Sequence, residues 1–271
     1  MKSPKFFPPS SFQVRPVNNP DVINTHMVQI DGKWVERPGT LAVIIGVTTE
    51  ENVDKIIEDI FGEIFKNSKI TSNPNLQTKI HDCKHKIYAV RYHLRTIKAE
   101  IDKRFNDFQK NYKAASGASF EQENPILIYE AESFLFQVKS NLDLIVQVLS
   151  HIVPSLKSFR TFAHSGTPGK SDYITGGKFI KTLEKASEKE LQDIFETNRI
   201  EWIQEMTIWR DTITHYSKLK NFSCFIEEPY RGGDVVIHYP SMPNKERLDD
   251  YCNKIYERLI KLYQNLFRTI F

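Results

Sequence analysis

The feature that most constrains the fold is a set of long stretches in which apolar residues recur at steps of three and four. This spacing places the apolar side chains on one face of an α-helix, so each stretch predicts an amphipathic helix that buries that face. The stretch after Pro125 ends near Pro154, because a proline does not continue a helix. The predicted helices cover roughly residues 75–113, 125–154, 199–218 and 245–271, with shorter ones near 179–185 and 188–195.

The N-terminal part shows β patterns instead. Asp31-Gly32 separates two short β-like runs and is a strong signal for a hairpin turn, and residues 41–47 form a further β-branched run. Thr48 or Thr49, followed by acidic residues, predicts the N-cap of a helix over roughly residues 50–66. We therefore expect a small β-containing appendage before the long helices.

A second hairpin is predicted before the last helix, from the runs 222–226 and 235–239. By contrast, the polar stretch 114–124 predicts a loop between the first two long helices. The predicted fold class is mainly α: an antiparallel helical bundle over residues 71–271, preceded by an arm and a small β/α appendage over residues 1–70.

Composition favours a cytoplasmic protein without a membrane anchor. The three cysteines, Cys83, Cys224 and Cys252, are scattered and odd in number, which argues against a disulfide framework. No run reaches the roughly 20 apolar residues that a membrane span needs, and no signal peptide is evident. The net charge of +3 permits a nucleic-acid partner without requiring one.

Arg210 and His215, near the end of the helix predicted over residues 199–218, form the pair to which we assign any chemistry. An arginine binds phosphate through a planar fork of donors and stays charged. A histidine transfers a proton near neutral pH. Together they suffice for RNA cleavage without a metal or another cofactor, with the histidine as general base or acid and the arginine on the scissile phosphate.

The spacing of this pair sets a geometric requirement. A step of five residues turns about 500° around a helix, which leaves the two side chains about 140° apart. One copy brings them together only where the helix loosens near residues 212–214, whereas a two-fold dimer brings both pairs together across its interface. Spacing alone is a weak signal, because about 0.35 such pairs are expected by chance at any fixed offset in this composition.

The pattern Arg210-Asp-x3-His215 at the end of the third long helix resembles the HEPN superfamily, in which an arginine precedes a histidine by a few residues and Asn, Asp or His is favoured after the arginine. The upstream stretch 130–144 is similar to the second HEPN helix, and the similarity covers roughly residues 75–220. The resemblance implies a helical bundle, often a homodimer in which the Arg/His pairs face each other in a cleft. Many members are metal-independent endoribonucleases of defence or toxin–antitoxin systems.

Under this resemblance Arg210 and His215 would be catalytic, and Asp211 would help to orient them. The substrate would be RNA, and an antitoxin or another protein would be a partner. Other HEPN members are inactive, so the alternative is a catalytically inactive scaffold that binds a partner through its N-terminal appendage. A purely structural role also stays open, with Arg210 paired to Glu201 or Glu205 and His215 finishing the helix near its negative end.

The basic, glycine-rich stretch 157–178 is a candidate contact for the RNA backbone, or else an ordinary mobile surface loop. Residues 164–171 are not a P-loop, because His164 stands where the first glycine is required and no apolar strand precedes it. The candidate RNA-binding residues are Lys157, Arg160, Lys170 and Lys178.

Two further patterns are given structural interpretations. His81 and His85 share a helical face, but Cys83 points away from it, so no metal site is predicted there. The many basic residues of the helix over 75–113 are interpreted as a solvated face, with a nucleic-acid surface as the alternative.

Overall fold

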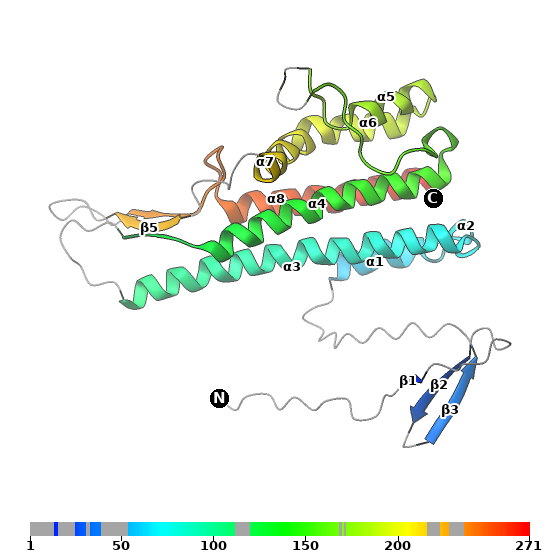
Figure 1. Cartoon of the computed structure of the whole chain (residues 1–271), viewed down its shortest axis with the longest axis horizontal. Helices are drawn as coiled ribbons and strands as arrows, with labels where there is room; N and C mark the ends of the chain where they lie inside the picture. Colours follow the sequence, from blue (N-terminus) through cyan, green and yellow to red (C-terminus); the bar gives the residue numbers. More distant parts are fainter. Residues whose placement is uncertain are drawn as a thin grey trace. The chain divides into compact units, whose positions relative to one another are not determined.

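The computed structural model describes residues 14–15, 25–30, 33–38, 54–111, 120–167, 170, 172–215, 223–227 and 236–271, and this part of the chain is mainly α-helical (Figure 1). The chain divides into two units, residues 1–53 and 54–271. The division falls at residue 53 instead of 70, because helix α1 (Lys55–Ile64) packs against helices of the second unit. The helix expected over 50–66 therefore belongs to the bundle and not to the appendage.

The first unit contains an antiparallel sheet with strand order β1 (Val14–Arg15), β2 (Thr25–Ile30) and β3 (Lys33–Pro38). Ile30 pairs with Lys33, so β2 and β3 form the predicted hairpin, while the predicted turn at residues 31–32 lies outside the described residues. The predicted β run 41–47 lies outside the described residues.

The N-cap of α1 is Asp54, so the prediction of Thr48 or Thr49 is wrong. The Asp54 Oδ1 accepts hydrogen bonds from the backbone N–H groups of Ile56 (3.0 Å) and Ile57 (3.3 Å). Its other carboxylate oxygen is 3.0 Å from the Arg91 Nε, and it accepts a 2.8 Å bond from the Tyr256 hydroxyl. One carboxylate thus caps α1 and links it to two other helices of the bundle.

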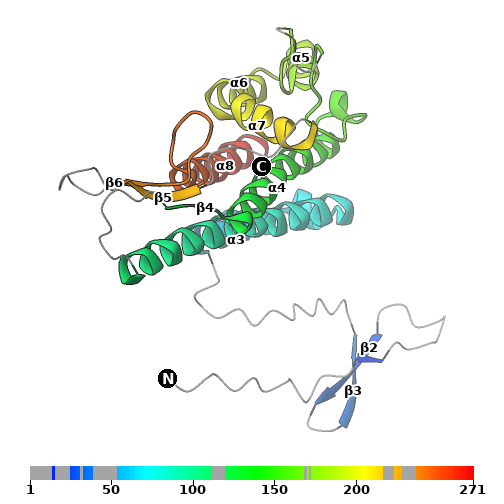
Figure 2. The same ribbon diagram turned by 60° about the vertical axis from the view of Figure 1, so that its left-hand side comes forward.

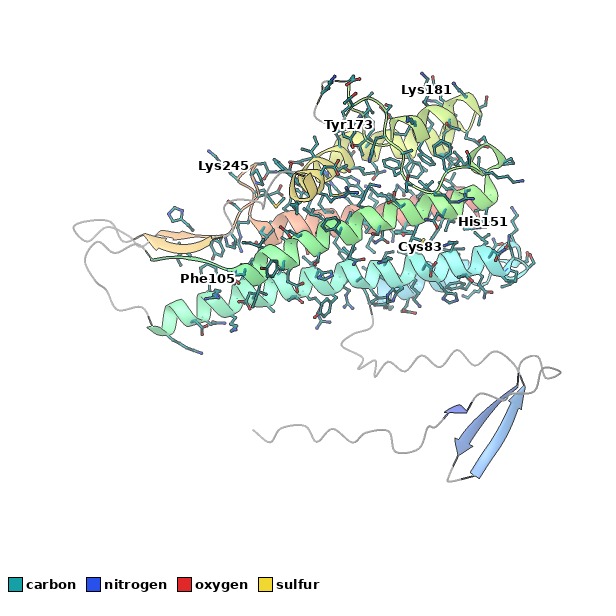
Figure 3. All side chains as sticks on the ribbon, in the orientation of Figure 1. Cys83, Phe105, His151, Tyr173, Lys181 and Lys245 are labelled. Carbon is teal, nitrogen blue, oxygen red and sulfur yellow. The ribbon has the colours of Figure 1, made fainter. Side chains whose placement is uncertain are left out.

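The centre of the second unit is an antiparallel pair of long helices, α3 (Pro74–Asn111) and α4 (Pro125–Ile152), which run side by side (Figure 1). The short helix α2 (Ser68–Thr71) precedes α3, and α8 (Leu248–Ile270) packs on both long helices. As predicted, α4 ends directly before Pro154, with Val153 as its C-cap. The apolar stripes of these helices meet in one core, and side chains fill the space between them (Figure 3).

The short helix predicted near 188–195 and the long helix predicted over 199–218 are continuous in the structure. Helix α6 (Lys189–Asn198) continues through a π-helical turn, Arg199–Ile203, into α7 (Gln204–His215) without leaving helical backbone. The prediction of separate helices at 188–195 and 199–218 is therefore wrong. Trp202 is fully buried inside the π-helical turn, and its indole N–H donates a 2.8 Å bond to Asn198. The wide turn thus forms where a large side chain enters the core.

A second sheet lies at one end of the bundle (Figure 2). Strands β5 (Ser223–Glu227) and β6 (Val236–His238) form the predicted hairpin. The stretch 114–124 is not entirely loop, because residues 120–123 form strand β4 (Phe120–Glu123), which pairs with β5. Within the described part of the chain, no helix is long and apolar enough to cross a membrane.

Candidate functional site

The segment that connects α4 to α5 (Gly177–Lys185) is anchored by an aromatic cluster. The Phe162 ring is fully buried, with its centroid 5.5 Å from that of Phe179 and 5.7 Å from that of Phe195. Farther along, the Thr175 N–H donates a 3.0 Å bond to the Gln204 side chain of α7. These contacts hold the segment against α5, α6 and α7, so its polar side chains have defined neighbours.

On α4, Lys139 and Asp143 form an ion pair one helical turn apart. The Lys139 Nζ is 2.5 Å from the Asp143 Oδ1, and the lysine side chain is only 6% exposed. The same carboxylate oxygen accepts a 2.7 Å bond from the backbone N–H of Phe162. Burial lowers the pKa of Lys139, and the Asp143 charge opposes that shift. Asp143 thus joins the connecting segment to a buried amine.

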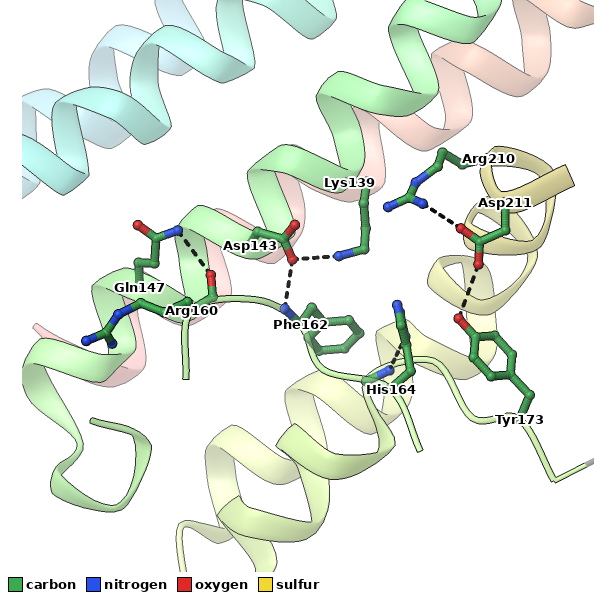
Figure 4. A network of polar contacts seen from close by, with 10 residues as sticks. Lys139, Asp143, Gln147, Arg160, Phe162, His164, Tyr173, Arg210 and Asp211 are labelled. Carbon is green, nitrogen blue, oxygen red and sulfur yellow. Dashed lines mark hydrogen bonds and ion pairs between the residues drawn. The ribbon is translucent and has the colours of Figure 1, made fainter. Parts of the chain in front are cut away.

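On α7, Arg210 and Asp211 form a second ion pair (Figure 4). The Arg210 Nη1 is 2.7 Å from the Asp211 Oδ1, while the Asp211 Oδ2 accepts a 3.2 Å bond from the Tyr173 hydroxyl. Burial raises the pKa of Tyr173 to about 12, and the Asp211 charge acts in the same direction, so the phenol stays protonated. The Arg210 and Asp211 side chains are 21% and 20% exposed, so solvent reaches this pair.

His164 lies between the two ion pairs. Its Nδ1 accepts a 3.1 Å bond from the backbone N–H of Gly176, so the proton of the neutral ring sits on Nε2. Burial lowers the pKa of His164 to about 4, and the positive charges of Lys139 and Arg210 act in the same direction. The ring is therefore neutral at neutral pH. Figure 4 shows it directed toward Lys139 and Arg210.

We call Lys139, Asp143, His164, Tyr173, Arg210 and Asp211 the α4–α7 polar cluster. Each carboxylate in it already accepts from two donors, one of them a cation. Apart from its two carboxylates and the tyrosine, the cluster consists of three donor groups: the Lys139 amine, the Arg210 guanidinium and the His164 Nε2–H. Such a set suits an oxyanion, because N–H groups and cations stabilise negative charge on phosphate oxygens. It does not suit a divalent metal, because both carboxylates are paired with cations and the free nitrogen of the His164 ring, Nε2, carries a proton.

The structure brings together Arg210 and Asp211, two of the three residues predicted to be catalytic. His215 lies on α7, and its side chain is outside the described residues. The backbone of α7 stays helical as far as His215, so the helix does not loosen near residues 212–214. Within one copy, helical geometry therefore keeps positions 210 and 215 on different faces. Of the carboxylates considered as partners, Glu205 instead accepts a 2.9 Å bond from Asn244.

The four residues predicted to bind RNA do not share one place. Lys157 and Arg160 line the same surface hollow. Lys178 is exposed on the first turn of α5, and Lys170 is exposed in the connecting segment. None of the four belongs to the α4–α7 polar cluster.

Sequence reasoning missed four members of this cluster, Lys139, Asp143, His164 and Tyr173. One signal was present: Lys139 interrupts the apolar stripe of its helix and has an aspartate four residues later, a spacing that favours an ion pair. No comparable signal marks His164 and Tyr173, because their partners lie far away in the chain.

The residues of the His81–His85 pattern have other roles in the structure. The His81 ring stacks on Phe65 with centroids 4.3 Å apart. Cys83 is fully buried, and burial raises the pKa of its thiol to about 12, so the thiol stays protonated. In the parts of the chain that are described, no three His, Cys, Asp or Glu residues are grouped to hold a metal ion.

Comparison with known proteins finds no matching family model, no similar curated protein and no similar solved structure.

Proposed function

We propose that this chain is a HEPN-like protein that cleaves RNA without a metal, with Arg210 as the group that binds the scissile phosphate. The observation that carries the proposal is the α4–α7 polar cluster, in which Arg210, Lys139 and the Nε2–H of His164 face one region while both carboxylates are engaged. Three donors of this kind stabilise the charge that develops on phosphate oxygens in phosphoryl transfer.

The reaction we propose is attack of a ribose 2′-oxygen on the neighbouring phosphorus. The new bond joins the 2′-oxygen to phosphorus, and the bond from phosphorus to the 5′-oxygen breaks. The 2′-hydroxyl proton goes to the imidazole of His215, and the leaving 5′-oxygen takes a proton from water. The products carry a 2′,3′-cyclic phosphate and a 5′-hydroxyl.

In this proposal the protein acts as a homodimer. Helical geometry separates positions 210 and 215 by about 140° on one helix. A two-fold axis near α7 would place Arg210 of one copy beside His215 of the other.

The test is incubation of single-stranded RNA of mixed sequence with the wild-type protein in EDTA, followed by analysis of the product ends. The proposal expects 2′,3′-cyclic phosphate ends from the wild type and their loss in Arg210→Ala and His215→Ala. Absence of cleavage by the wild type, or cleavage that survives both substitutions, would refute it.

A second candidate function is a catalytically inactive HEPN-type scaffold. It is favoured by the ion pair between Arg210 and Asp211 and by the bond from Tyr173 to Asp211, which engage these groups within the protein. Under this alternative the cluster stabilises the α4–α7 contact, and Arg210→Ala lowers the melting temperature while no RNA is cleaved by either protein.

A further inference from the structure

A separate basic hollow lies at the C-terminal end of α4, where His151 is labelled in Figure 3. Its volume is about 430 Å³, within the range of small-molecule binding sites. Four of its lining residues are of basic type and none is acidic. The lining residues are Lys79, Gln147, Ser150, His151, Lys157 and Arg160.

The local fold holds these groups in place. The side-chain amide of Gln147 donates a 3.1 Å bond to the carbonyl of Arg160, which ties the turn after α4 to the helix. The Arg160 Nη1 donates to the carbonyls of Lys157 (2.8 Å) and Phe159 (3.0 Å). These two bonds of Nη1 fix the orientation of the Arg160 guanidinium.

The hollow carries an excess of positive charge. Neither Lys157 nor Arg160 forms an ion pair with any carboxylate in the described ranges, and both residues are exposed. Lys79 forms an ion pair with Asp82, with its Nζ 3.5 Å from the carboxylate, but Asp82 does not line the hollow. A guanidinium and an ammonium that face one space form a binding site for phosphate oxygens.

The hollow and the α4–α7 polar cluster lie along the same helix. Lys139, Asp143, Gln147 and His151 follow one another at four-residue steps on α4, a ridge that winds slowly around the helix. From Lys139 to His151 this ridge rises about 18 Å along the axis. Figure 4 shows Gln147 and Arg160 at one end of the row and Arg210 at the other.

We propose that this hollow binds a backbone phosphate of the RNA strand, several nucleotides away from the bond cleaved at Arg210. The choice of RNA as the source of the phosphate rests on the proposed function. The hollow then sets where along the strand cleavage occurs, because it holds the strand by a second phosphate at a fixed distance from Arg210.

The test measures binding separately from cleavage. A labelled single-stranded RNA of about a dozen nucleotides, 2′-O-methylated so that it cannot be cleaved, is titrated by fluorescence anisotropy at several salt concentrations. Lys157→Gln/Arg160→Gln is compared with Lys181→Gln/Lys185→Gln, which removes the same charge from exposed residues of α5. Lys157→Glu alone leaves the hydrogen bonds of the Arg160 side chain in place.

The hollow variants should bind at least about fivefold more weakly than wild type. In the double variant the slope of log K against log salt should fall by about 0.7, because the hollow neutralises one phosphate and each neutralised phosphate accounts for about 0.7 on a single strand. The α5 control should bind within about twofold of wild type. Equal affinity of the hollow variants and the control overturns the proposal.

Failure of the two proposals is distinguishable. If the hollow variants bind like wild type but Arg210→Ala abolishes cleavage of ordinary RNA, the hollow proposal is wrong and the cleavage proposal stands. If the hollow variants lose RNA binding and the wild type cleaves no RNA, the hollow is a phosphate site and the cleavage proposal is wrong.

Discussion

The backbone N–H of Gly176 donates a 3.1 Å hydrogen bond to the Nδ1 of His164, and this bond determines which nitrogen of the imidazole ring is the hydrogen-bond donor. With Nδ1 occupied as an acceptor, the neutral ring carries its proton on Nε2, on the side of Lys139 and Arg210. The histidine beside Arg210 within one copy is thus a neutral N–H donor. It adds to the binding of an anion without adding a third positive charge.

A first prediction concerns pH. His164 has a pKa of about 4 in the folded protein, against 6.5 for an unperturbed side chain. Between these values the unfolded chain binds a proton that the folded chain does not, so the free energy of unfolding falls as the pH decreases from 6.5 to 4. After allowance for partial solvent screening, the loss is on the order of 2 kcal/mol.

Urea denaturation of wild type and His164→Asn across this pH range measures the effect. The variant should show a smaller loss of stability with acidification. His85→Asn, a change at an exposed histidine, serves as control and should keep the wild-type dependence. Identical pH dependence in wild type and His164→Asn would contradict the assignment of a neutral, partly buried imidazole.

A second prediction concerns the ion pair within α4. Asp143→Ala leaves the buried Lys139 amine without its carboxylate and removes the acceptor of the Phe162 N–H, so it should destabilise the fold by about 3 kcal/mol. Lys139→Met keeps the length of the side chain and leaves Asp143 with one donor, so it should cost about 1 kcal/mol. Chemical denaturation gives both values, and the reverse order would show that the amine, not the carboxylate, organises this contact.

A third prediction compares two glycines. Gly176 has a φ of +70°, and a Cβ there would lie 2.1 Å from the Phe162 ring, so Gly176→Ala should destabilise by about 3 kcal/mol. Gly62 lies within α1, and a methyl group added there would have open space around it, so Gly62→Ala should stabilise by about 0.5–1 kcal/mol. Thermal melts of the two variants test both values. An unchanged melting temperature in Gly176→Ala would mean that the segment before α5 adjusts freely.

A fourth prediction concerns the proposed dimer. If Arg210 acts with His215 of a second copy, mixing inactive Arg210→Ala and His215→Ala proteins allows mixed dimers with one intact site. Activity should return to about a quarter of the wild-type level after subunit exchange. A mixture of Arg210→Ala and His164→Ala should show no more activity than the two proteins assayed separately, since those residues share one copy. No recovery in the first mixture would place the site within a single copy.

The bundle was predictable because its information is local. Steps of three and four in the apolar residues of α3, α4 and α8 follow from the helical period and do not depend on distant residues. The join between α6 and α7 was not predictable in this way. A π-helical turn shifts the period of the apolar stripe, so the pattern directly before this turn, at residues 196–198, resembled a break between two helices.

Strand β4 and the α4–α7 polar cluster depend instead on non-local contacts. The four residues of β4 form a strand because β5, about a hundred positions later, supplies their hydrogen-bond partners. In the same way, His164 acquires its tautomer from the hydrogen bond of Gly176, and its low pKa from burial together with the charges of Lys139 and Arg210. Arg210 was singled out from its spacing to His215, and Asp211 from the resemblance to the HEPN pattern, but the neighbours that complete the cluster required the fold.

The most direct test of the proposed function is the single-turnover rate of RNA cleavage in EDTA by wild type and Arg210→Ala, with thermal melts to establish that both proteins are folded. Loss of a group that stabilises the charge on the phosphate should lower the rate at least about 100-fold. A folded Arg210→Ala protein that cleaves within about twofold of the wild-type rate would contradict the assignment of Arg210 to the scissile phosphate.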